Sequence, residues 1–294
     1  MAFFLQVLCM GLIQGMVYVV IGLSLVMVYK SSNVFNFSIG EFATLGGIIF
    51  YLACKTGMPI PVVFALFIIF SAFGGFVINR IVIQPLMGRE PLSITLVTIG
   101  LSTFLVGLYQ LTFGSHPASL EFDLPNLTFE LGGLFFSSTQ VWSGILALIS
   151  IVALLLFYQF TRWGIVMRAT AEGQVKAMAF GISTRSILAL TWALASIVAG
   201  IGGLVVAWGG ALTYNMGIIG LVAIPVVLVG GLDSIGGCII GGFLIGIIEV
   251  MTSFYLEPAI GLEGCRSVTP YLFLLLILLI RPTGLLGQVR IERV

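Results

Sequence analysis

MAFFLQVLCMGLIQGMVYVVIGLSLVMVY, residues 1–29, contains no charged side chain, and the first charge in the chain is Lys30. An α-helix of about 20 apolar residues is long enough to cross the hydrocarbon core of a bilayer. The stretch has neither the basic start nor the small-residue cleavage site of a secretory signal peptide, so we expect it to be retained. It is therefore predicted to be the first membrane span.

Composition supports the same class of protein, since 60% of the 294 residues are apolar and 8% are charged, with a mean hydropathy of +1.21. These values are typical of an integral membrane protein. The net charge of +1 provides no field that would attract nucleic acid. Because His116 is the sole histidine and the cysteines lack CxxC spacing, we expect no metal or redox site. The cysteines are Cys9, Cys54, Cys238 and Cys265.

Apolar runs between charges and Pro or Gly breaks predict an all-α polytopic membrane protein, with eight to ten crossings and nine favoured. Residues 1–294 are expected to form a single transmembrane domain. Three runs, 41–54, 217–232 and 267–280, are shorter than about 20 residues, so each could be re-entrant or buried within the bundle. The other predicted helices are 3–29, 60–83, 92–113, 139–160, 187–208 and 235–256.

The distribution of Lys and Arg predicts the orientation, because cytoplasmic loops carry the excess of these residues. The segment 114–138 has three acidic side chains and neither Lys nor Arg, so we expect it to be external. Nine helices then place the N-terminus outside and the C-terminus inside, and Lys55 is the one charge that disagrees. The basic residues expected in the cytoplasm are Arg80, Arg89, Arg162, Arg168, Lys176, Arg185, Arg281, Arg290 and Arg293.

Charge is concentrated in RWGIVMRATAEGQVKAMAFGISTR, residues 162–185, which an uncharged run follows as far as Asp233. Arg168, Glu172 and Lys176 have i, i+4, i+8 spacing, which places opposite charges on one face of a helix. Gly181 has the position of a glycine that ends a helix. The pattern predicts a short helix at the cytoplasmic surface on which a soluble protein docks.

An apolar row formed by Ala171, Val175 and Met178 lies beside these charges at i, i+4, i+7 spacing. The other interpretation is a helix that lies in the lipid headgroups, since such helices are also amphipathic. Mixed charges and mostly small apolar residues favour the protein-docking interpretation, because a lipid-binding helix usually sets bulky apolar residues against Lys and Arg.

Glycine interrupts two regions in opposite halves of the chain, NFSIGEFATLGG (36–47) and VGGLDSIGGCIIGG (229–242), and each region has one acidic residue. In transporters, paired breaks of this kind leave half-helix ends that point into a cavity. A weak internal repeat is one interpretation of the pattern. Close packing of helices through small residues is the other.

Four stretches carry a resemblance to a known family. They are NFSIGEF (36–42), RATAEGQVKAMAFGIS (168–183), GGLDSIGGCIIGG (230–242) and LLLILLIRPTGLLG (274–287). In this order they resemble the membrane subunits of high-affinity branched-chain amino acid ABC importers. The resemblance runs from end to end, and it is closer to the shorter of the two permease subunits that such systems pair.

The resemblance implies two groups of functional residues. Residues 162–186 correspond to the cytoplasmic coupling loop, in which a short helix fits a groove on the ATP-hydrolysing subunit. The coupling residues would be Arg168, Glu172, Lys176, Ala177, Gly181 and Arg185. The translocation pathway would include Asn36, Gly40, Glu41, Gly230, Gly231, Ser234 and Gly236. Asp233 replaces a common glycine, and Ser38 and Ile39 replace a common Ala-His pair, so the substrate could differ from leucine, isoleucine or valine.

Three acidic residues lie in or near predicted spans, where an unpaired charge is expensive and a functional role is the default expectation. They are Glu41, Asp233 and Glu249. We expect Glu249 to be the deepest of the three and add it to the pathway residues, although a neutral or hydrogen-bonded carboxyl group would explain it equally. Asp233 could instead cap the helix that follows it.

The energy source divides the candidate functions. None of the three lysines lies in a P-loop, so the chain is not expected to bind nucleotide or to be an enzyme, and ATP and Mg²⁺ would be bound by partner subunits. The favoured function is an importer subunit in the bacterial inner membrane, with a second permease chain, two ATP-binding subunits and an external solute-binding protein. The alternative is an ion-coupled secondary transporter without subunits. A channel or an intramembrane enzyme is a third class. Branched-chain or related hydrophobic amino acids are the favoured solutes, and aromatic acids, amides and urea remain open.

Overall fold

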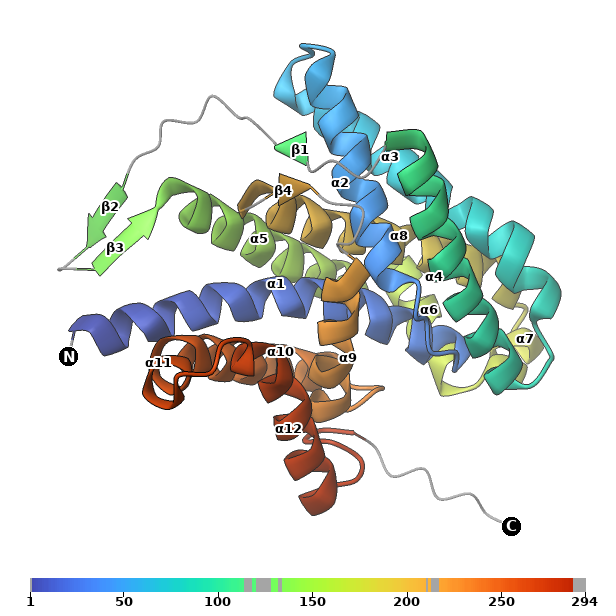
Figure 1. The fold of residues 1–294 in the computed structure, drawn as a ribbon. Coiled ribbons are helices and arrows are strands. Elements are labelled where there is room, and N and C mark those ends of the chain that lie inside the picture. The colour runs from blue at the N-terminus through green and yellow to red at the C-terminus, as the bar shows by residue number, and fades with distance from the viewer. Residues whose placement is uncertain are drawn as a thin grey trace.

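The computed structural model describes residues 2–113, 118–119, 128–131, 134–209, 211–212 and 217–287. Helices dominate these residues, and the chain folds around the first of them (Figure 1). In chain order the main helices are α1 (Ala2–Ser32), α2 (Ile39–Lys55), α3 (Ile60–Ile78), α4 (Pro91–Phe113), α5 (Ser138–Phe160), α6 (Arg162–Glu172), α7 (Gln174–Ala179), α8 (Thr184–Gly209), α9 (Gly217–Gly230), α10 (Ile235–Met251) and α12 (Cys265–Ile280).

Helix α1 lies in the centre of the described residues, between α5 and α10 (Figure 1), and it also contacts α8 and α9. Its residues from Val17 to Val28 are buried, since a helix that is apolar all round can be covered on every side. Glycine permits the close contact with α10, because a Cβ on Gly11 would lie 2.7 Å from the Cα of Ile247. The first 29 residues therefore form the helix around which the others pack.

The predicted spans are present. Six described helices are long and apolar enough to cross a membrane, including α3 with its continuation through Asn79–Ile83 and Gln84–Leu86, and α10 with its continuation through Thr252–Leu256 and α11 (Glu257–Ile260). The three runs predicted to be short form α2, α9 and α12, of 17, 14 and 16 residues. The structure thus confirms an all-α polytopic membrane protein.

Short strands occur where the sequence predicted only a loop. Within 114–138, β2 (Thr128–Leu131) pairs with β3 (Leu134–Ser137). Strand β1 (Ala118–Ser119) pairs with β4 (Ala211–Leu212), which lies between α8 and α9. Strand β3 leads directly into α5, whose N-cap Ser137 exchanges hydrogen bonds with Gln140 in a capping box. His116, Glu121 and Asp123 lie outside the described residues.

Basic side chains from distant parts of the sequence meet on one surface. A pocket of about 430 Å³ is lined by the end of α1, the turn before α4 and the start of α7. Another, of about 370 Å³, joins the end of α1 to α6 and to the turn between α9 and α10. A third, of about 520 Å³, joins Arg80 to the start of α8. We call this surface the basic face; Lys30, Arg80, Arg89, Arg168, Lys176 and Arg185 line its pockets.

Candidate functional site

Helix α2 begins in the interior of the protein. Helix α1 ends beside Asn33, which has a positive φ of 55°, and the chain then runs inward to Ile39. The side-chain oxygen of Asn36 accepts hydrogen bonds from the backbone N–H of Ser38, at 3.0 Å, and from its hydroxyl, at 2.7 Å. This local turn is typical of Asn and holds the segment ahead of α2 in place.

Glu41, in the first turn of α2, is 3% exposed. It is the only charged residue among the buried polar residues in the described part of the chain. The hydroxyl of Ser102 donates to its Oε1 at 3.2 Å, and the hydroxyl of Tyr109 donates to its backbone carbonyl at 3.1 Å. Ser102 lies about halfway along α4 (Pro91–Phe113). Glu41 is therefore held near the middle of a spanning helix, away from either end.

Helix α9 begins at the same place. Figure 1 shows the N-terminal end of α2 close to the top of α9, and a Cβ on Gly40 would collide with the carbonyl group of Gly217. The Glu41 carboxylate is the group nearest to a Cβ built on Gly217. With 14 residues at about 1.5 Å each, α9 spans roughly 21 Å, which is less than a bilayer core of about 30 Å. We call Asn36, Ser38, Gly40, Glu41, Ser102 and Gly217 the helix-end junction.

Two polar atoms of the junction have no hydrogen-bond partner among the described residues. They are Oε2 of Glu41 and Nδ2 of Asn36, and both side chains are buried, Asn36 at 0% exposed. Buried polar atoms are normally paired, so each exception needs an explanation. Two helix N-termini also meet here, and each carries partial positive charge and N–H groups without intrahelical acceptors. The junction can thus interact with a cationic group and with an anionic group.

Glu249 lies in a different place. It is half-buried on α10, and the hydroxyl of Tyr18, on α1, donates to its Oε2 at 2.5 Å. The expectation that Glu249 is the deepest acidic residue is wrong with respect to burial, because Glu41 is more buried. The structure does not bring Glu249 to the helix-end junction, and its hydrogen bond agrees with the alternative of a paired carboxyl group.

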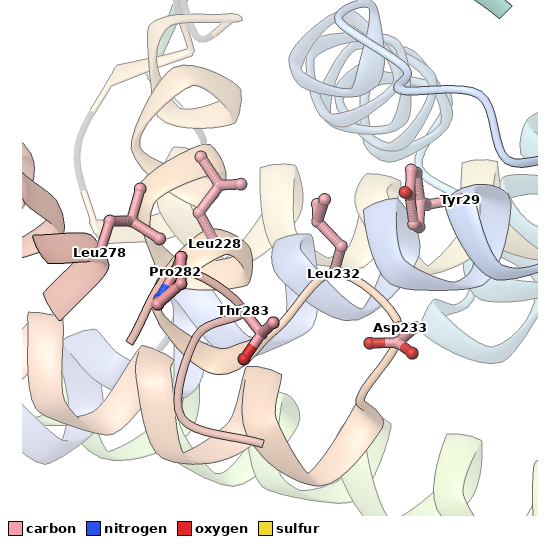
Figure 2. Close-up of a pocket in the computed structure, with 7 residues that line it drawn as sticks. All are labelled: Tyr29, Leu228, Leu232, Asp233, Leu278, Pro282 and Thr283. Atoms are coloured by element: carbon pink, nitrogen blue, oxygen red, sulfur yellow. The ribbon is translucent and has the colours of Figure 1, made fainter. Parts of the chain in front are cut away.

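The later glycine region forms the turn between α9 and α10 at the basic face, so the structure does not bring it to Glu41. Ser234 caps α10 through a 3.0 Å hydrogen bond from the N–H of Gly237, so the expectation that Asp233 provides this cap is wrong. Figure 2 shows Asp233 and Thr283 beside a pocket of about 180 Å³. The predicted pathway residues in this turn are Gly230, Gly231, Ser234 and Gly236.

These findings alter the expected pairing of the glycine regions. The start of α2 meets the start of α9 at Gly217, whereas the first turn of α10 contacts Gly230 at the end of α9. The regions 36–47 and 229–242 therefore do not face each other across one cavity. Gly217, Ser102 and Tyr109 were not predicted from the sequence. An apolar run of 14 residues that begins with glycine was the available signal for Gly217.

The charged segment folds as two helices rather than one. Helix α6 ends at Glu172, and α7 begins at Gln174 after Gly173, so the predicted continuous helix over 168–183 is wrong. Arg168 and Glu172 lie on α6, whereas Lys176 lies on α7, so the three do not share one helix. Its guanidinium instead donates to the carbonyl oxygens of Tyr158 and Gln159, which have no intrahelical donors at the end of α5.

Helix α7 presents apolar side chains at the basic face. Val175 is 77% exposed, Met178 is 51% exposed and Phe180, directly after the helix, is 87% exposed. Ala177, a predicted coupling residue, is instead buried, while Lys176 is exposed and Arg185 lines the pocket that also contains Arg80.

Two contacts define the ends of α7. The side chain of Gln174 donates to the carbonyl oxygen of Ser31, in the last turn of α1, at 2.9 Å. At the other end, Gly181 has a φ of 80°, and the N–H groups of Gly181 and Ile182 bond back to Met178 and Ala177. This is the glycine-ended helix terminus that the sequence predicted. Gln174 was not predicted, since nothing in its spacing indicates a partner so distant in the sequence.

Comparisons with known proteins give one consistent result. The family model described as "Branched-chain amino acid transport system / permease component" matches residues 7–281. The permease protein LivH of Escherichia coli (strain K12), of a high-affinity branched-chain amino acid transport system, is 28% identical over 308 residues, covering 99% of this chain and 98% of that protein. BraD of Pseudomonas aeruginosa, with the same description, is 29% identical over 306 residues, with coverage of 99% and 98%. No solved structure gives a significant match.

Proposed function

Because this chain belongs to the family of branched-chain amino acid transport system permease components, we propose that it is a membrane-spanning subunit of an ATP-driven importer in a bacterial inner membrane. The solute would be a branched-chain or related hydrophobic amino acid, as the names of the relatives indicate. A second, related permease chain would complete the pathway, and an external binding protein would deliver the solute. Two partner subunits would bind and hydrolyse ATP with Mg²⁺.

The exposed apolar side chains of α7 are the observation that carries this proposal. Val175, Met178 and Phe180 protrude from a surface on which Lys and Arg gather. Positive charge marks the cytoplasmic side of membrane proteins, so α7 would face the cytosol. Apolar side chains that protrude there are expected to be covered by a protein partner, since bulky anchors in pockets supply most of the energy at interfaces. This partner would be the ATPase subunit.

The contact between α7 and α1 offers a route from such a partner to the pathway. Gln174 joins α7 to Ser31, and seven residues further along the chain is Ser38, which precedes α2. A displacement of α7 would therefore act on the short segment that leads to Glu41. Close-packed elements transmit displacement of this kind because their interiors have low compressibility.

The experiment that tests the function is purification of the tagged chain from native membranes in mild detergent, with identification of stoichiometric partners by mass spectrometry. We expect P-loop ATPases and a second permease. The double variant Val175→Glu, Phe180→Glu should lose the ATPases and keep the permease, whereas Phe129→Glu, on the exposed strand β2, should keep both. Recovery of the folded chain alone, with uptake intact, would contradict the proposal and favour a secondary transporter.

A further inference from the structure

We propose that the helix-end junction is a binding site in the translocation pathway for the charged groups of an amino acid zwitterion. The carboxylate of Glu41 would accept the ammonium group, and the N–H groups of the first turn of α9 would bind the carboxylate. This inference rests on the proposed function, and it assigns the recognition of the passing solute to this chain as well as to an external binding protein.

The helix-end junction lies at the depth of the membrane interior. Polar contacts link it to Ser102, halfway along α4. Helix α9 ends at the basic face, and its 14 residues are too few to cross a bilayer, so its first residue, Gly217, lies within the membrane region. Helix ends inside a membrane are tolerated where they are buried in protein or line a cavity. Discontinuous helices whose ends meet near the midplane are a known way to build a solute site.

Glu41 has unused hydrogen-bonding capacity. One carboxylate oxygen accepts from Ser102, and the other has no partner among the described residues although the side chain is buried. A buried carboxylate that served only to balance two helix dipoles would still be expected to have both oxygens satisfied. Asn36, three residues before α2, has an unpartnered Nδ2, which is a hydrogen-bond donor. Separation of the two helix ends would make both groups available to a ligand.

The junction combines a negative group with a positive helix end. The Glu41 carboxylate faces Gly217, the first residue of α9, so a negative group lies directly beside a positive helix end. A zwitterionic α-amino acid carries its two charged groups on one carbon atom and matches this arrangement. Acetamide and urea carry no charge and would leave the Glu41 carboxylate unpaired, which costs binding free energy in a dry site.

The packing of the junction indicates how passage would be controlled. Gly40 and Gly217 are in such close contact that no side chain fits between them, so the two helix ends close on each other in this conformation. Separation of α2 from α9 would open the space beside Glu41. The segment before α2, which follows the α7 contact with Ser31, is placed to produce this separation.

The test uses the complete complex, with its ATPases, second permease and binding protein, in proteoliposomes. Uptake of radiolabelled leucine and of radiolabelled acetamide is measured together with ATP hydrolysis. We expect the wild type to import leucine. Glu41→Gln should lower leucine uptake by about tenfold or more at unchanged hydrolysis and assembly, because an amide cannot pair with the ammonium group. Glu263→Gln, an exposed acid-to-amide change between α11 and α12, is the control and should have no effect.

A second variant covers the case in which Glu41→Gln does not assemble. Glu41→Asp keeps the charge and moves it by one methylene group, so the apparent KM for leucine should rise several-fold. Normal leucine kinetics in either variant would overturn the inference. So would ATP-driven import of acetamide by the wild type at a rate similar to that of leucine, and in both cases the importer function would stand. If the wild type shows no ATP-driven uptake of either solute, the proposed function fails and the inference fails with it.

Discussion

At the scale of single residues, two glycines in equivalent positions have opposite requirements. Gly40 is the second residue of α2, and Gly236 is the second residue of α10. A Cβ on Gly40 would meet the backbone of Gly217, whereas a Cβ on Gly236 would have Leu286 Cδ1 at 3.9 Å as its nearest neighbour. The requirement for glycine therefore comes from the neighbouring helix and is independent of the position within its own helix.

Gly40→Ala should destabilise the junction by about 1–3 kcal/mol, because the backbone of α9 has to move to admit the methyl group. Gly236→Ala should be neutral or slightly stabilising, since alanine is preferred over glycine within helices. Thermal unfolding of the purified complex, together with uptake, measures both effects. Equal melting temperatures for the two variants would contradict the close contact at Gly217.

Arg168 provides a second test at this scale, because its guanidinium binds the last carbonyl groups of α5 and lies 5.8 Å from the centre of the Tyr158 ring. Arg168→Ala should destabilise the end of α5 by about 1–2 kcal/mol through the loss of these bonds. Arg162→Ala, an exposed change in the first turn of α6, serves as the control. A thermal shift in the control as large as that in Arg168→Ala would argue against a specific contact.

At the scale of secondary structure elements, the break at Gly173 separates two tasks. Helix α6 is attached to the end of α5, while α7 is attached to the end of α1 and exposes its apolar side chains. A continuous helix would have held both parts rigidly together. Under the proposed function, the break would let α7 move with a docked partner while α6 stays in place.

Gln174→Leu should therefore weaken the connection between ATP hydrolysis and transport, because α7 loses its 2.9 Å hydrogen bond to Ser31. We expect a several-fold fall in the amount of solute imported per ATP hydrolysed, at unchanged binding of the ATPase. Gln159→Leu makes the same exchange at an exposed position on α5 and should leave the ratio unchanged. An unaltered ratio in Gln174→Leu would remove this contact from the coupling route.

At the scale of the whole molecule, most of the described Lys and Arg side chains gather on the basic face. Lys30, Arg80, Arg89, Arg168, Lys176 and Arg185 line pockets of the basic face. Helix α2 begins in the interior and ends at Lys55, away from this face. Helix α12 begins at Cys265, next to Arg266, and ends just before residues 282–283, which share a pocket with Asp233 beside the basic face. The asymmetry predicts that the basic face is cytoplasmic.

Cysteine labelling tests this orientation. In a variant without the four native cysteines, Val175→Cys should react with a membrane-impermeant thiol reagent in inverted vesicles stripped of the ATPase subunits, and stay unlabelled in intact cells. Glu130→Cys, on the exposed strand β2, should show the reverse. Labelling of both positions from the same side would contradict the predicted orientation with nine crossings.

The helices, including the three short ones, could be predicted from the sequence because hydrophobic length is a local property that a bilayer converts directly into spans. The end of α7 at Gly181 was predictable for a similar reason, since a helix terminus depends on a few consecutive residues. The break at Gly173 was not predicted, because the i, i+4 spacing of Arg168, Glu172 and Lys176 is equally compatible with one helix. The contacts of Arg168 with α5 decide otherwise.

The sequence by itself determined that this chain is a polytopic membrane protein, and it indicated the family, since both depend on local composition and on short motifs in a fixed order. The tertiary structure alone decided which residues meet. It brought Gly217 and Ser102 to Glu41, from 176 and 61 positions away, and it placed Glu249 with Tyr18 elsewhere. The physical reason is that hydrophobic length identifies a span but does not say which other span it packs against. That pairing depends on close contacts between small residues and on buried hydrogen bonds.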